Sequence, residues 1–159
     1  MTALRDLRAA TLADFAWRTD VDTRWADNDR YGHLNNAVYL ALFDSAINRL
    51  VHDRVAPPWD LEARGVVAES GTAYFRELGY PMSLAVGLSV ERLGSSSVTY
   101  RLALAERDAD GPIAAAGHWV HVYVDPATGA PTAIPAALRA VLEPLVRDAP
   151  AREDPTANG

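Results

Sequence analysis

The sequence predicts an α+β fold in which one long helix packs against an antiparallel sheet of five or six strands. Three observations support this prediction. A stretch in which apolar and polar residues alternate precedes a single long apolar segment of helical length. Four strand-like runs follow that segment, and short turn signals separate these runs. Short turns favour antiparallel pairing. The chain has 159 residues and 49% hydrophobic content, which is enough for one domain with a real core. We place this domain at residues 1–147 and expect a disordered tail at 148–159.

The first two elements lie in the first third of the chain. Apolar and polar residues alternate from Phe15 to Val21, which predicts a strand. A helix is predicted from about Asn36 to Asp53, because its polar residues form one narrow stripe while apolar side chains cover most of the girth. We therefore expect other parts of the protein to surround this helix.

The remaining elements follow in a regular order. We expect strands at about 66–75, 82–92, 96–106 and 113–124, separated by turn signals at 78–81, 93–95 and 108–112. A short amphipathic helix is predicted to begin near Pro135.

Composition excludes several classes of function. The absence of cysteine removes disulfides, thiolate metal sites and a cysteine nucleophile. All 15 basic residues are arginine, which excludes a phosphate-binding P-loop and a Schiff base. The net charge of −6, with arginines scattered singly, argues against nucleic acid as a partner. His118 and His121 lie three apart in a predicted strand and point to opposite faces, so we expect no metal site there. No membrane span and no signal-peptide core are evident, which predicts a cytoplasmic protein.

Residues 24–39 concentrate the polar groups from which an active site can be built. Asp27 and Asp29 precede Gly32, and Asn35 or Asn36 can cap the predicted helix. The exposed backbone N–H groups and the positive dipole end at a helix start can hold a carbonyl oxygen that becomes negative during reaction. Asp29 would face these donors across the turn, which is an arrangement suited to hydrolysis.

The string from Asp27 to Tyr39 resembles the signature of hotdog-fold acyl-thioester hydrolases, the group of 4-hydroxybenzoyl-CoA thioesterase and the plant acyl-carrier-protein thioesterases. The resemblance implies a sheet curled around a central helix. It also implies hydrolysis of an acyl-CoA substrate with neither a metal nor an organic cofactor.

The resemblance also implies roles for single residues. Asp29 corresponds to the catalytic carboxylate, acting as nucleophile or as general base. Asn36 falls where the bacterial enzymes polarise the thioester carbonyl with a helix-start backbone N–H. His33 matches the histidine of the plant enzymes, whose catalytic asparagine is replaced here by Tyr31. The expected substrate contacts are Gly32, Asn35 and Tyr39, with Arg30, Arg76 and Arg92 as candidates for binding CoA phosphates.

Two other functions remain open at this point. One is a different hotdog enzyme, such as a dehydratase, and the other is a non-catalytic acyl-CoA-binding module in which Asp29 only caps a turn. In either case the edges of the sheet are open, and hotdog relatives join subunits edge to edge. We therefore expect a homodimer or tetramer with CoA bound across the interface.

Overall fold

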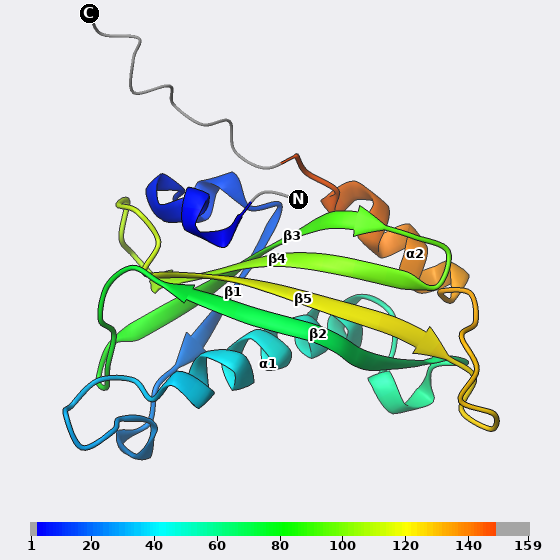
Figure 1. Ribbon diagram of the computed structural model, residues 1–159, viewed down its shortest axis with the longest axis horizontal. Helices are drawn as coiled ribbons and strands as arrows, with labels where there is room; N and C mark the ends of the chain where they lie inside the picture. Colours follow the sequence, from blue (N-terminus) through cyan, green and yellow to red (C-terminus); the bar gives the residue numbers. More distant parts are fainter. Residues whose placement is uncertain (1–2, 149–159) are drawn as a thin grey trace, which may run out of the picture.

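The computed structural model of the protein describes residues 3–148 and contains one five-stranded antiparallel sheet with a long helix on one face (Figure 1). This confirms the predicted α+β class with five strands rather than six. Most of the predicted tail at 148–159 lies outside the described residues. The elements, in chain order, are β1 (Trp17–Asp22), α1 (Asn36–Arg54), β2 (Arg64–Tyr74), β3 (Ser83–Leu93), β4 (Ser97–Glu106), β5 (Ala115–Val124) and α2 (Ala136–Leu142).

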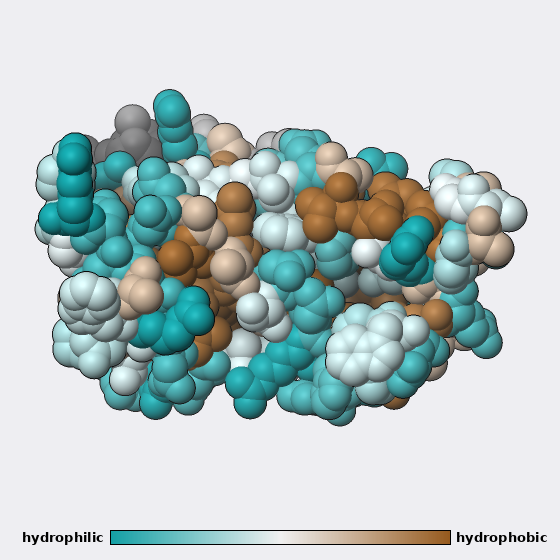
Figure 2. Space-filling model, turned by 90° about the horizontal axis from the view of Figure 1, so that it is seen from below, coloured by the Kyte–Doolittle hydropathy of each residue, from teal (hydrophilic) through white to brown (hydrophobic). Residues whose placement is uncertain are grey.

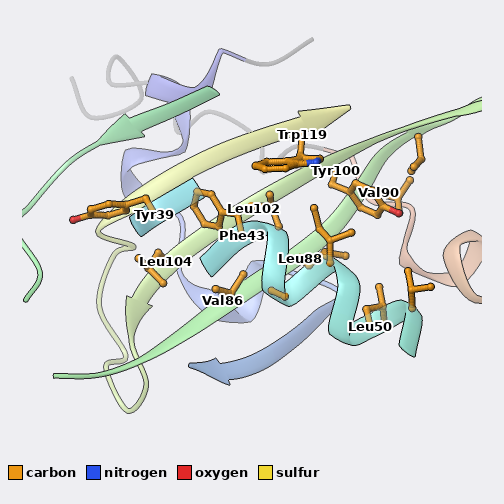
Figure 3. Packing of buried hydrophobic residues seen from close by; sticks show 14 of the residues in the cluster. Tyr39, Phe43, Leu50, Val86, Leu88, Val90, Tyr100, Leu102, Leu104 and Trp119 are labelled. Carbon is orange, nitrogen blue, oxygen red and sulfur yellow. The ribbon is translucent and has the colours of Figure 1, made fainter. Parts of the chain in front are cut away.

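The core lies between α1 and the sheet. The buried residues of α1, which include Tyr39, Phe43, Ile47 and Leu50, recur three or four positions apart and form one stripe along the helix. Figure 3 shows this stripe facing the side chains that β3, β4 and β5 present to the helix, among them Val86, Leu88, Leu102, Leu104 and Trp119.

A glycine in β5 lets the helix approach the sheet closely. A Cβ atom at Gly117 would lie 2.6 Å from the Phe43 ring. Phe43 itself is fully buried. The packing of Phe43 against β5 therefore depends on the absence of a side chain at position 117.

The order of strands in the sheet is β1-β3-β4-β5-β2, so β2 pairs with β5 and not with β3. The expectation that short turns join four consecutive strands is therefore correct for β3, β4 and β5 but wrong for the step from β2 to β3. The segment that connects β2 to β3 does not bring these two strands side by side. Leu78 is buried in it, and the Leu78 carbonyl accepts a hydrogen bond of 2.7 Å from the backbone N–H of Leu34. This segment thus anchors the turn that precedes α1.

The other face of the sheet is covered by the N-terminal segment, for which the sequence analysis assigned no element. Two short 3-10 helices, Leu4–Ala9 and Leu12–Asp14, lie over the sheet opposite α1 (Figure 1). Leu7 and Leu12 pack there against small buried residues of the strands, including Ala85, Ala103 and Ala116. The two 3-10 helices and these strand residues form a second apolar cluster, on the face of the sheet opposite α1.

Among residues 3–148, no other segment surrounds the outer face of α1, contrary to the expectation from its apolar side chains. Val38, Leu40 and Leu42 are only partly buried. Figure 2 views the molecule from the helix side and shows apolar patches among the polar side chains. Within one chain the sheet covers a single face of the helix.

The edge strand β2 is also largely exposed. Seven consecutive residues at its start, 64–70, are exposed, and Val67 and Tyr74 retain 49% and 45% of their accessible surface. A long edge strand with exposed apolar side chains is a template for pairing with another strand.

Candidate active site

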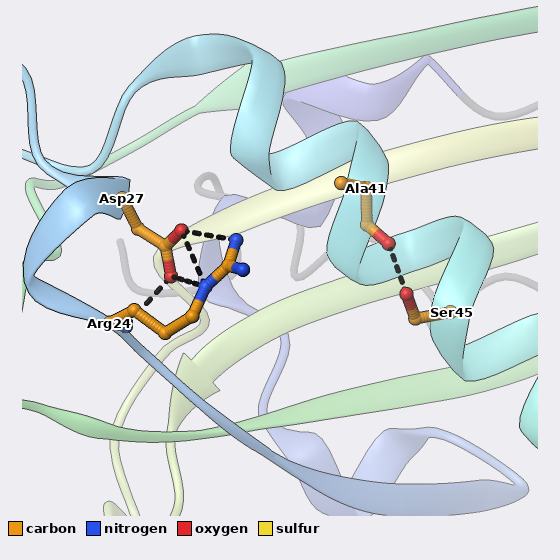
Figure 4. A network of polar contacts seen from close by, with 4 residues as sticks. All are labelled: Arg24, Asp27, Ala41 and Ser45. Carbon is orange, nitrogen blue, oxygen red and sulfur yellow. Dashed lines mark hydrogen bonds and ion pairs between the residues drawn. The ribbon is translucent and has the colours of Figure 1, made fainter.

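The turn between β1 and α1 is fixed first by Asp27, which is buried. Its carboxylate accepts hydrogen bonds from the backbone N–H of Arg24 at 2.7 Å and from the Arg24 guanidinium at 2.8 Å (Figure 4). The guanidinium hydrogen bond lowers the pKa of Asp27 below its usual value. The Asp27 carbonyl in turn accepts from the N–H of Asn35, at 2.9 Å. Asp27 therefore serves the structure of the turn.

Replacing Asp27 is expected to affect stability much more than turnover. Asp27→Asn loses the charged hydrogen bonds to Arg24, and the free energy of unfolding should fall by roughly 0.5 to 2 kcal/mol at pH 7. Because the folded-state pKa of Asp27 is lowered, its contribution is fully present above the unfolded pKa of about 3.9 and is lost as pH falls through the folded value. Thermal melts should show that the gap between variant and native protein is smaller at pH 3 than at pH 7. The matched control is Asp22→Asn, which weakens an exposed ion pair with Arg107 and should cost less.

Asp29 is held by the backbone of the turn that it begins. One carboxylate oxygen accepts from the N–H groups of Tyr31 at 2.8 Å and of His33 at 3.2 Å. Gly32 adopts a φ of 84°, a conformation that favours glycine, and so closes the turn. The second carboxylate oxygen of Asp29 accepts no hydrogen bond from residues 3–148, which leaves it available to a ligand.

The start of α1 carries the backbone N–H donor that the sequence predicts at this position. Asn35 is the N-cap, since its side-chain oxygen accepts from the N–H of Ala37 at 3.0 Å. Asn36 is the first helical residue, and its own backbone N–H donates no hydrogen bond within the described chain. A free N–H at the positive end of a 19-residue helix favours an oxygen that carries negative charge.

One pocket brings most of the predicted site residues together. It has a volume of about 300 Å³ and is lined by Asp29, His33, Asn36, Tyr39 and Arg76, along with Leu34, Tyr74, Phe75 and Glu77. The carboxylate of Asp29 and the start of α1 therefore border the same pocket.

Four of the lining residues, Leu34, Tyr74, Phe75 and Glu77, are not among the site residues predicted from the sequence, and two of them make specific contacts. Glu77 lies with its carboxylate 3.1 Å from Nε2 of His33, and Tyr74 makes an edge-to-face contact with Tyr39 at 5.0 Å between ring centroids. Both are about 40 positions away along the chain, at the end of β2 and in the segment after it. No spacing pattern in the sequence links them to the turn, because the contact depends on how β2 leaves the sheet.

The other predicted substrate contacts lie elsewhere or are already engaged. Gly32 and Arg30 line a neighbouring open hollow with Asp29, and Asn35 serves as the helix cap. Arg76 bonds to Glu106 at 3.1 Å and to the carbonyl of Pro112 at 3.0 Å. Arg92 lies near the end of β3 opposite Thr99 and lines neither hollow. Within one chain the structure thus gathers Asp29, His33, Asn36, Tyr39 and Arg76, and not Arg92.

The two histidines of β5 lie as expected on opposite faces of the sheet. His118 pairs with Glu69 at 2.9 Å, while His121 is buried on the side of α1. Across residues 3–148 there is no group of three or more histidine, aspartate or glutamate side chains positioned to hold a metal ion. The same residues contain no helix that is both long and apolar enough to span a membrane.

Comparison with known proteins places the chain in a family. A sequence profile of the thioesterase-like superfamily matches residues 23–142. The crystal structure of the PA5185 protein from Pseudomonas aeruginosa strain PAO1 is 39% identical, with a TM-score of 0.83, covering 87% of this chain and 96% of that one. A thioesterase from Thermus thermophilus, solved as a complex with coenzyme A and Zn, is 32% identical, with a TM-score of 0.69, covering 83% and 95%.

None of the curated proteins matches the chain. The profile, however, spans the turn, α1 and every strand from β2 to β5. The chain therefore belongs to the thioesterase-like superfamily and is a thioesterase with the hotdog fold.

Proposed function

We propose that this enzyme hydrolyses acyl-CoA thioesters to free CoA and a carboxylic acid, with Asp29 as the catalytic carboxylate. The observation that carries the proposal is the pairing, in one pocket, of a carboxylate with a free oxygen and a helix-start N–H without a partner in the described chain. The coenzyme A bound to the related thioesterase from Thermus thermophilus supports CoA as the carrier.

The reaction begins when the thioester carbonyl oxygen accepts a hydrogen bond from the N–H of Asn36. This bond and the helix dipole stabilise the negative charge that develops on the oxygen. In one route the free oxygen of Asp29 attacks the carbonyl carbon, the CoA thiolate leaves, and water then hydrolyses the mixed anhydride. In the other route Asp29 removes a proton from a water that attacks the same carbon, the C–S bond then breaks, and the departing CoA thiolate takes up the proton that Asp29 holds. Both routes require the same free carboxylate oxygen.

His33 acts as a positioning residue in this proposal. Its N–H binds the carboxylate of Asp29, and its ring is tied to Glu77. The backbone contact survives any change of the side chain, so His33→Ala should lower kcat only modestly. Arg30 lies at the exposed rim of the turn and is our candidate for a CoA phosphate contact, since within residues 3–148 its guanidinium contacts only the neutral Tyr31 whereas Arg76 is paired with the carboxylate of Glu106.

The test is CoA release from a panel of acyl-CoAs of different chain length and shape, followed with a thiol reagent. We expect turnover with at least one member, abolished by removal of Asp29. Tight binding of acyl-CoA with no CoA release by the native protein would contradict the proposal and identify a binding module instead.

We further propose that the enzyme is a homodimer joined through β2. β2 is the longer of the two edge strands, its apolar side chains are exposed, and both of its ends border pockets on the helix side of the sheet. Two β2 strands paired antiparallel across a two-fold axis would continue the sheet from one subunit into the other.

The dimer predicts a molar mass of twice the 17.2 kDa of one chain, or a multiple of that for a tetramer. Val67→Asp places a charge on the exposed edge and should shift the assembly toward monomer and lower activity with it. The matched control is Arg18→Asp, at an exposed position of the opposite edge strand β1, which should leave the assembly intact. Light scattering and turnover measured on the same samples decide this, and a native monomer with full turnover would contradict it.

A further inference from the structure

A second cavity lies at the far end of α1 from Asp29. It has a volume of about 270 Å³, and its walls come from α1, the segment after it, the start of β2 and the end of β5. The residues that define it are Asn48, Trp59, Arg64, Gly65, His121 and Tyr123. An engineered cavity of about 150 Å³ already accepts benzene, so this one has room for a substituted ring or a short chain.

The cavity contains a buried hydrogen-bond donor. His121 is 6% exposed, and its Nε2 lies 2.9 Å from the indole Nε1 of Trp119. The indole nitrogen can only donate, so Nε2 must accept and the proton of the neutral ring sits on Nδ1. Burial lowers the pKa of His121, and the nearby carboxylate of Asp44 opposes this shift only in part. The ring is therefore neutral near pH 7.

The Nδ1–H group of His121 points into the cavity. A Cβ atom at Gly65, which lines the cavity, would lie 3.4 Å from Nδ1 and 3.3 Å from Cε1 of Tyr123. Within residues 3–148, Nδ1 bonds to no acceptor. The glycine thus leaves open the space that an oxygen atom bonded to Nδ1 would occupy.

A hydrogen-bond acceptor lies in the same cavity. The Nδ2 of Asn48 donates to the carbonyl of Asp44 at 2.9 Å, which fixes the orientation of the amide. Its Oδ1 accepts no hydrogen bond from the described residues. A hydroxyl group both accepts and donates, and so matches Nδ1–H of His121 and Oδ1 of Asn48 together. A carboxylate can accept from the histidine and pair with Arg64 at the cavity wall, but it offers no donor to Oδ1 of Asn48 and is repelled by Asp44.

The position of the cavity indicates which ligand carries this hydroxyl group. Asn48 lies twelve residues along α1 from Asn36, or about 18 Å, too far for a short acyl group held at Asn36 of the same chain. In an antiparallel β2 pair with its axis near the middle of the strand, however, the start of β2 lies beside the end of the other β2. Gly65 would then lie near the partner subunit's Tyr74, which borders the partner's catalytic pocket.

We infer that this cavity binds the hydroxyl-bearing end of the acyl group whose thioester is cleaved in the other subunit. The inference rests on the proposed function and its dimer. His121 and Asn48 then determine specificity, since an acyl group ending in a methyl leaves both polar groups without a partner. Trp59, which is 79% exposed, and Tyr123 supply flat apolar walls for a ring.

The test compares pairs of CoA esters that differ by one hydroxyl: 3-(4-hydroxyphenyl)propionyl-CoA with 3-phenylpropionyl-CoA, and 6-hydroxyhexanoyl-CoA with hexanoyl-CoA. For at least one pair, kcat/KM of the native enzyme should favour the hydroxylated ester by about tenfold or more. His121→Phe, Asn48→Leu and Gly65→Ala should each reduce the preference to within about threefold. His118→Phe, the same substitution in β5 at a residue that pairs with Glu69 and does not line the cavity, is the control and should retain the preference.

Binding of the corresponding non-hydrolysable CoA thioethers, measured by calorimetry, separates this inference from the proposed function. If the esters are cleaved without preference, or the preference survives all three cavity variants, the inference is wrong and the proposed function stands. If no ester is cleaved but His121→Phe weakens binding of the hydroxylated thioether alone, the cavity is correctly assigned and the proposed function is wrong. His121→Phe removes the buried hydrogen bond with Trp119. If the His121→Phe variant does not fold, Asn48→Leu on α1 provides the same test.

Discussion

Asp29→Asn should lower kcat by on the order of 10²-fold to 10⁴-fold, the usual effect of removing a positioned acid or base. The substitution isolates the chemistry because the amide oxygen of asparagine can still accept the two hydrogen bonds from Tyr31 and His33. What is lost is the negative charge on the oxygen that no residue of the described chain binds. Turnover of the panel of acyl-CoAs measures the loss.

Two controls make this result specific. Binding of a CoA thioether and the melting temperature should both change little in Asp29→Asn, because the turn is retained. His33→Ala should keep measurable hydrolysis, since the bond to Asp29 comes from its backbone. A loss with His33→Ala as complete as that with Asp29→Asn would instead show that the imidazole takes part in the chemistry, as in the plant enzymes.

Asn36→Pro should lower kcat by about 10²-fold to 10³-fold, the usual effect of losing one donor to the developing oxyanion. Proline removes the backbone N–H that is proposed to bind the carbonyl oxygen. Its structural cost should be small, because proline is well tolerated at the first position of a helix. The preceding residue, Asn35, already has the extended conformation that proline requires, with ψ of 138°.

The matched control is Asn36→Ala, which removes the side chain and keeps the N–H. Circular dichroism and thermal melts check that α1 is intact in both variants, and steady-state kinetics compares them. Equal activity of the proline and alanine variants would show that the N–H of Asn36 does not bind the reacting carbonyl. Equal loss in both would assign the role to the side chain.

The parts of the fold that sequence patterns predict are the local ones. Helix α1 was predicted to within one residue because its start is capped by Asn35 and its apolar residues repeat with the helical period. The turn around Gly32 was predicted for the same reason, since glycine, aspartate and asparagine determine its conformation over a few residues. The positions of Asp29 in this turn and of Asn36 at the helix start therefore follow from local sequence, while their catalytic roles stay a prediction.

Features that depend on contacts between distant segments were missed. The pairing of β2 with β5 is not encoded in any turn, and the role of Leu78 in holding Leu34 follows only from that topology. Glu77 reaches His33 through the same connection. The apolar character of α1 follows from the sequence, but within residues 3–148 the sheet covers only one side of the helix.

The cavity at His121 shows the same limit. From sequence, His121 was expected to be an ordinary strand residue on the face opposite His118, and its orientation was correct. The availability of its Nδ1–H group depends on Trp119, Gly65 and Asn48, which come from β5, β2 and α1. No short motif links these four positions.

The most direct test of the account is the single-turnover rate of thioester cleavage with enzyme in excess over acyl-CoA, because this rate reports the chemical step without product release. The account predicts that the rate constant falls at least 10²-fold in Asp29→Asn and in Asn36→Pro, and stays within about threefold of native in Asn36→Ala. A native-like rate constant in Asp29→Asn, accompanied by a lower melting temperature, would show that Asp29 only caps its turn and would contradict the mechanism.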